Sequence, residues 1–178
     1  MQKWIIRVVG GFFLLIALFF AVLYVASGGA NGKGYHEASI AINKPAAVIF
    51  PWLTEPEKLK AWIFGLTESK PLTEGGLRVG ARFEEIMVIG EEQTVTVSEV
   101  TELDPGKLMV VKITSQGFDG DIRYVLEEAG ASTTLRYTGN FQYKAFMLRL
   151  LEPLVTPSAQ RKLEEDLIKL KSVVEAGQ

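Results

Sequence analysis

The chain contains no cysteine and a single histidine, His36. The absence of cysteine excludes disulfides, thiol nucleophiles, iron–sulfur clusters and zinc sites built on cysteine. One histidine is too few for a histidine metal cluster, and we expect no metal and no cofactor. A catalytic triad would have to use His36, which follows a predicted flexible segment. We therefore predict no catalytic residue, and the choice between an enzyme and a binding protein stays open.

A stripe of positive charge is also missing. The formal net charge is −2, and basic residues such as Arg161 and Lys162 are interleaved with acidic ones. Proteins that follow the phosphates of nucleic acids need clustered positive charge. We expect no nucleic-acid partner.

One long segment, Val8 to Gly32, has no charged residue at all. As a helix, its apolar part would be about 28 Å long, close to the hydrocarbon thickness of a bilayer. Trp4 and Tyr24 lie near its ends, where aromatic rings favour the headgroup region. This pattern predicts a transmembrane helix over residues 4–26, after a short N-terminus of residues 1–3. A cleaved signal peptide, processed at the small residues that follow, is the alternative.

Positive charge is unevenly placed around this predicted span. Lys3 and Arg7 lie before or within its start, whereas Lys33 alone follows it closely. The positive-inside bias then places the N-terminus in the cytoplasm and the domain outside it. Residues 27–34 (SGGANGKG) are rich in glycine, which predicts a flexible tether leading to a domain of residues 35–176.

The domain begins with one strand and two short helices. Residues 36–42 alternate in polarity as a half-buried strand does. A first helix must break at Pro51, and a second opens at Thr54 and Glu57, which have the spacing of a capping box.

From residue 66 onward, the pattern has a period of two and is interrupted by glycine turns, which predicts antiparallel strands. These strands are expected at residues 66–72, 81–89, 94–103, 108–115, 121–127 and 133–143. Residues 146–154 are apolar at helical spacing, Pro153 and Pro157 interrupt them, and a long amphipathic helix closes the chain over residues 158–175.

This order of elements resembles the helix-grip fold of the START-like superfamily, also called SRPBCC, which includes the polyketide cyclase/dehydrase and lipid transport family. Residues 49–62 (IFPWLTEPEKLKAW) are similar to a recurring phrase of that family, and GLRVGARF, VTELDPGKL and YVLEEAGASTTL are similar to its hairpins. The resemblance implies an α+β fold, in which a curved antiparallel sheet wraps around a long C-terminal helix. It also implies a cavity between sheet and helix for lipids, polyketides or other apolar molecules.

The alternation along the strands gives candidate lining residues for such a cavity. The alternative is that they fill a solid core or, for Glu85, that its carboxylate is solvated on a sheet face. If Glu85 faces the cavity, burial raises its pKa and makes it a candidate acid or ligand anchor. The candidates are Phe83, Glu85, Met87, Ile122, Tyr124, Leu126, Leu135, Tyr137, Phe141, Phe146, Leu150 and Leu154.

Three functions fit these features. The leading hypothesis is membrane-tethered binding of a hydrophobic ligand, lipid or polyketide-like, in the cavity. The second is a cyclase or dehydratase acting on an apolar substrate through Glu85, Arg123, Tyr124 and Tyr137. The third is a protein-interaction module that uses the outer face of the sheet, with a partner that the sequence does not identify.

Overall fold

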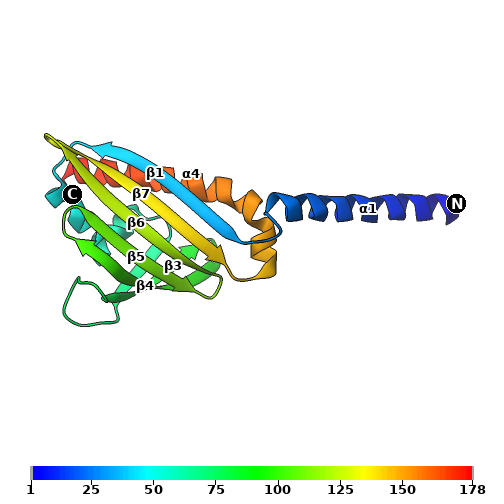
Figure 1. Ribbon diagram of the computed structural model, residues 1–178, viewed down its shortest axis with the longest axis horizontal. Helices are drawn as coiled ribbons and strands as arrows, with labels where there is room; N and C mark the ends of the chain where they lie inside the picture. The colour runs from blue at the N-terminus through cyan, green and yellow to red at the C-terminus, as the bar shows by residue number, and fades with distance from the viewer. Residues whose placement is uncertain (1, 178) are drawn as a thin grey trace.

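The computed structural model describes residues 2–177, with side chains described from residue 11 onward. Helix α1 (Gln2–Ala26) projects away from the rest of the protein (Figure 1). In the part of the chain whose side chains are described, no helix is both long and apolar enough to cross a membrane. The transmembrane span predicted over residues 4–26 is therefore not confirmed. Its predicted flanking side chains, Lys3, Trp4 and Arg7, lie outside the described part.

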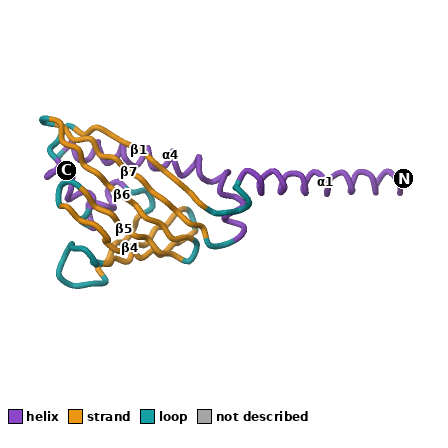
Figure 2. The backbone as a smooth tube through the Cα atoms, viewed as in Figure 1, coloured by secondary structure: helices purple, strands orange, loops and turns teal. Residues whose placement is uncertain are grey.

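The body of the protein is a seven-stranded antiparallel sheet with the strand order β1-β7-β6-β5-β4-β3-β2. All seven predicted strands are present, and Figure 2 shows them as one curved layer. The strands are β1 (Lys33–Ile42), β2 (Leu66–Pro71), β3 (Arg82–Ile89), β4 (Glu92–Asp104), β5 (Leu108–Ser115), β6 (Phe118–Ala129) and β7 (Ser132–Tyr143). With the C-terminal helix, this confirms the predicted α+β helix-grip architecture.

Short helices connect β1 at one edge of the sheet to β2 at the other. They are α2 (Ala46–Ile49), the 3₁₀ helix η1 (Phe50–Leu53) and α3 (Pro56–Trp62). Pro51 has no N–H for an α-helical hydrogen bond, so the α-helical segment is short and gives way to η1, as predicted. The indole N–H of Trp62 donates to the carbonyl of Trp52 at 2.8 Å, which joins η1 to α3.

The predicted capping box at the start of α3 is wrong. The Thr54 hydroxyl donates back to the carbonyl of Phe50 at 3.1 Å and is not available to the helix. Glu55 occupies the N-cap position without a capping side-chain hydrogen bond. Thr54 therefore closes the preceding 3₁₀ turn.

Helix α4 (Phe146–Ala176) is continuous through Pro153 and Pro157, so the predicted interruption at the prolines is wrong. Each proline removes one intrahelical hydrogen bond, and such sites bend a helix more often than they end it when neighbouring turns are packed. Figure 1 shows the first turns of α4 running in a different direction from the rest of the helix. Its C-terminal half packs against the sheet.

The segment between α1 and β1 is a packed turn, and Lys33 and Gly34 belong to β1, in place of the flexible tether predicted over residues 27–34. Ser27 and Ala30 are buried, and the Ser27 hydroxyl accepts a hydrogen bond from the Ala30 N–H at 2.9 Å. The N–H of Tyr143 donates to the Gly32 carbonyl at 2.8 Å, and β1 already begins at Lys33. These contacts fix the turn to the edge of the sheet.

Candidate functional site

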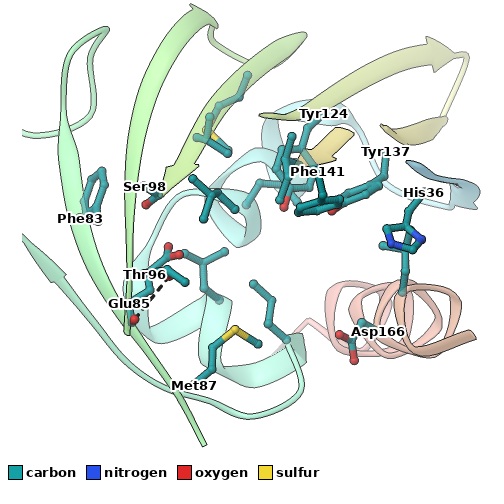
Figure 3. A pocket seen from close by; sticks show the side chains of 18 of the residues that line it. His36, Phe83, Glu85, Met87, Thr96, Ser98, Tyr124, Tyr137, Phe141 and Asp166 are labelled. Atoms are coloured by element: carbon teal, nitrogen blue, oxygen red, sulfur yellow. Dashed lines mark hydrogen bonds between the residues drawn. The ribbon is translucent and has the colours of Figure 1, made fainter. Parts of the chain in front are cut away.

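A cavity of about 430 Å³ lies between the inner face of the sheet and helices α3 and α4. Most of its lining side chains are apolar, and strands β3 to β7 supply the larger part of its wall. Cavities of a few hundred Å³ with this character are typical small-molecule sites. Figure 3 shows Glu85, Thr96 and Ser98 on one side of the cavity and His36 on the other, with Tyr124, Tyr137 and Phe141 between them.

The structure brings seven of the twelve candidate residues to the cavity wall. These are Phe83, Glu85, Met87, Ile122, Tyr124, Tyr137 and Phe141. Their side chains point to the inner face of the sheet. Candidates two positions apart on one strand lie there together, because side chains alternate between the two faces.

The other five candidates lie elsewhere. Leu126 and Leu135 fill the solid part of the core, and Leu150 is buried away from the cavity. Phe146 and Leu154 are 59% and 54% exposed, because the first turns of α4 extend beyond the cover of the sheet. The helical spacing of apolar residues does not show at which residue α4 begins to pack against the sheet.

The candidates predicted from the sequence omit several parts of the wall, including the side chains of α3 and the part of α4 that carries Asp166. Two further omissions have identifiable causes. The first is formed by β4 and β5, where inward-facing residues alternate along each strand. On β5 the alternation of apolar residues was visible in the sequence, whereas on β4 the polar residues Thr96 and Ser98 obscured it. The second is His36, for which we expected no catalytic role because it follows a predicted flexible segment. It is 5% exposed, lies within β1 and faces the cavity.

Glu85 supplies a carboxyl group to the wall, between apolar neighbours on its own strand and the hydroxyls of Thr96 and Ser98 on β4. It lies between Phe83 and Met87 on β3, and its register partner on β4 is Thr96. Burial raises the pKa of Glu85 above its ordinary value, and a hydrogen bond with Ser98 opposes the shift only in part. Glu85 thus lies on the cavity side of the sheet, where it is only partly exposed.

Asp166 on α4 is the second carboxyl group of the cavity, and it has partners. Its carboxylate lies 3.4 Å from Nζ of Lys162 and accepts a hydrogen bond from the Phe64 N–H at 3.3 Å. Nζ of Lys162 also lies 4.0 Å from the centroid of the Phe64 ring. Burial raises the pKa of Asp166 despite these partners. This cluster joins α4 to the segment after α3 at the edge of the cavity.

Two tyrosines supply phenol groups from β6 and β7. The rings of Tyr124 and Tyr137 meet edge to face, with centroids 5.4 Å apart. Burial raises the pKa of both phenols far above the ordinary value of 10.0. Both stay protonated at physiological pH and can act as hydrogen-bond donors.

His36 is a polar residue on the side of the cavity opposite Glu85. Its ring lies 5.5 Å from that of Phe141, and its Nδ1 has no hydrogen-bond partner among the described residues. Burial lowers the pKa of His36, while a hydrogen bond with Gln160 and the charge of Glu152 oppose the shift. Burial therefore favours the neutral form of the imidazole, and one of its ring nitrogens is buried without a hydrogen-bond partner.

Two glycines make room for the ring of Phe141. A Cβ atom at Gly120 would lie 2.6 Å from Cδ1 of Phe141, and one at Gly139 would lie 2.8 Å from its Cε2. Real Cβ atoms do not approach other carbons this closely. Glycine at both positions therefore lets the ring lie flat against β6 and β7, where it forms part of the wall.

The arrangement favours binding through apolar contact and a few hydrogen bonds. Within the described residues, no group of three or more acidic or histidine side chains is placed to hold a metal ion. Arg123, considered above as a catalytic group, faces outward and pairs with Glu102 at 3.3 Å. The polar groups that line the cavity include Glu85, Asp166, the two phenols and His36, together with the hydroxyls of Thr96 and Ser98.

Comparison with known proteins agrees with this geometry. Residues 36–175 match the family described as polyketide cyclase/dehydrase and lipid transport. No curated protein matches the sequence closely enough to be informative.

Solved structures with the same fold are distant in sequence. A protein from Thermus thermophilus has a TM-score of 0.68 at 18% identity, covering 81% of this chain and 99% of its own. The Zhui aromatase/cyclase from Streptomyces sp. R1128 has a TM-score of 0.65 at 16% identity, covering 80% and 94%. A Chromobacterium violaceum protein has a TM-score of 0.63 at 15% identity, covering 80% and 97%. At these identities, the similarity shows the fold alone.

Proposed function

Because the chain belongs to the polyketide cyclase/dehydrase and lipid transport family, we propose that it binds a hydrophobic ligand, lipid or polyketide-like, in the cavity between the sheet and α4. The observation that supports this proposal is the cavity itself, about 430 Å³ in volume and lined mainly by apolar side chains. A solid core would not leave this space, because protein interiors are close-packed.

The experiment is to purify the full chain from its native cells and to analyse organic extracts by mass spectrometry. Val111 lines the cavity, so Val111→Trp should fill it and reduce the bound molecule strongly. Lys112→Trp is the matched control, because Lys112 is the exposed next residue on β5. If the wild-type protein carries no more apolar material than Val111→Trp does, the proposal fails.

We further propose that α1 tethers the domain to a membrane, with the N-terminus in the cytoplasm and the domain on the other side. Large apolar side chains are exposed along this helix, including Phe12 at 61%, Leu14 at 71% and Val25 at 77%. Such side chains are more stable in a hydrocarbon environment than in water.

Alkaline extraction of membranes from expressing cells tests the tether. The full chain should remain in the membrane fraction, and Leu14→Arg with Leu18→Arg should release it, because each arginine costs about 2.5–3.5 kcal/mol at the centre of a bilayer. The mass of the mature protein separates this proposal from a cleaved signal peptide, which would remove the N-terminal segment. Accessibility of Lys112 to an impermeant amine reagent in intact cells, compared with lysed cells, reports the orientation.

A cyclase-type or dehydratase-type enzyme is the second candidate. It is favoured by Glu85, Tyr124 and Tyr137, which bring one carboxyl group and two protonated phenols into one apolar cavity. One structural relative is named an aromatase/cyclase. If incubation with linear poly-β-ketone mimics gives no cyclised product above the uncatalysed rate, the enzyme proposal fails and the ligand-binding proposal is the one left.

A further inference from the structure

The two carboxyl groups of the cavity differ in the partners that they have. Asp166 is close to a lysine and accepts a backbone hydrogen bond. Glu85 forms no ion pair among the described residues, and hydrogen bonding with Ser98 is the one influence that opposes the rise in its pKa. A carboxylate offers about four acceptor positions, so most of those of Glu85 remain available on the cavity side.

The neighbouring hydroxyl does not satisfy this remaining capacity. Thr96 is 3% exposed and lies opposite Glu85 in the β3–β4 register. Its hydroxyl donates to the backbone carbonyl of Glu85 at 3.4 Å, not to the carboxyl group. The other close neighbours along β3, Phe83 and Met87, have no strong hydrogen-bond donor. Figure 3 shows this group of side chains on one wall of the cavity.

Glu85 is partly buried, and a partly buried carboxyl group with unused acceptors costs stability, because its ionised form has lost part of its hydration without gaining an equivalent partner. Leucine or methionine at this position would avoid that cost. A ligand that supplies a hydrogen-bond donor would instead recover it when bound. In a mainly apolar cavity, Glu85 would then favour the binding of an apolar molecule that carries one hydrogen-bond donor.

We propose that the ligand is an apolar molecule with a hydroxyl or amino group, and that this group donates a hydrogen bond to the Glu85 carboxyl group. This inference rests on the proposed binding function and specifies the chemical class of its ligand. Molecules with a carboxylate in the same position are disfavoured, because two carboxylates would face each other in a cavity of low polarity.

The probes are decanol, decylamine and decanoate, which share one alkyl chain and differ in the polar group. They are titrated, below micelle-forming concentrations, into the full chain reconstituted in phospholipid nanodiscs and labelled with ¹³C at its methionine methyl groups. Met87 and Met109 line the cavity and report binding there. Met147 is 50% exposed on α4 and serves as the internal reference for partitioning into the lipid.

We expect decanol and decylamine to bind at least about tenfold more tightly than decanoate, the size of one hydrogen bond to a charged group. Glu85→Leu should abolish this preference, and Glu85→Gln should weaken decylamine more than decanol. Glu84→Leu is the matched control, because Glu84 is the next residue on β3 and does not line the cavity. The methionine spectrum of each variant also checks that it is folded.

Each other outcome overturns the inference in a recognisable way. Equal affinities with shifts at Met87 and Met109 would leave binding in the cavity intact and remove the role of Glu85. Tighter binding of decanoate would show that a protonated Glu85 donates to an acidic ligand. If no probe shifts either methyl group, the proposed binding function fails together with the inference.

Discussion

The inner face of the sheet is packed in two different ways. Where the C-terminal half of α4 crosses the sheet near β1, the side chains fit without space, and Ile42, Leu135 and Leu170 are each 0% exposed. Near β3 to β5, the same face is bounded by α3 and α4 but is not filled, and the cavity remains. Both regions use strands with the same alternation of residues. The difference therefore arises from how closely the helices approach the sheet, and not from the pattern within any strand.

Two leucines one turn apart on α4 provide the sharpest test of this comparison. Leu167 is 1% exposed in the solid region, whereas Leu163 borders the cavity. We expect Leu167→Ala to reduce the free energy of unfolding by about 2–5 kcal/mol. Leu163→Ala should cost about 1–2 kcal/mol, because its side chain already borders open space. Urea unfolding measures both, and equal losses would show that the cavity region is packed as tightly as the rest.

A substitution at Gly120 tests whether the position of the Phe141 ring in the cavity wall depends on glycine. Gly120→Ala places a Cβ against the ring of Phe141, and we expect a loss of about 1–3 kcal/mol in the free energy of unfolding. Adding Phe141→Leu should restore part of the loss, because the shorter side chain leaves room for the new methyl group. A double-mutant cycle measures this coupling. Additive effects would mean that the ring does not depend on glycine at this position.

Glu85 should make the cavity region less stable as the pH rises. Its pKa is raised in the folded protein above the ordinary value of 4.5. The unfolded chain therefore loses the proton first, and stability falls as the pH rises from 4.5 through the folded pKa. Glu85→Gln should remove this part of the pH dependence and raise the melting temperature at neutral pH. Thermal unfolding from about pH 4 to 8 checks the difference, which Glu84→Gln should not reproduce.

His36 should give a smaller effect in the opposite direction. Its pKa is lowered in the folded protein below the ordinary value of 6.5, so the unfolded chain takes up the proton first as the pH falls. Stability is then lost from pH 6.5 downward until the folded histidine also becomes protonated. His36→Phe should flatten the stability profile between about pH 7 and 5. A profile unchanged by this substitution would show that the imidazole is solvated.

The sequence predicts the sheet well, because the period of two and the glycine turns are local signals. The break at Pro51 was also predictable, since a missing N–H acts wherever the residue lies. The site was predictable only in part. Phe83, Glu85 and Met87 share a face whatever the register, but Phe146 and Leu154 depend on where a bent helix first meets the sheet. His36 was missed because its burial comes from β7 and α4, which are far away in sequence.

The packed turn between α1 and β1 also connects the two parts of the molecule mechanically. Because Ser27 and Ala30 are buried and Gly32 is hydrogen-bonded to Tyr143, a rotation of α1 about its own axis should turn the whole domain with it. One residue advances a helix by about 100°. A single alanine inserted ahead of Ser27 would therefore swing the domain by roughly this angle around the helix axis. The number of residues in α1 should therefore set the direction in which the cavity faces relative to the start of this helix.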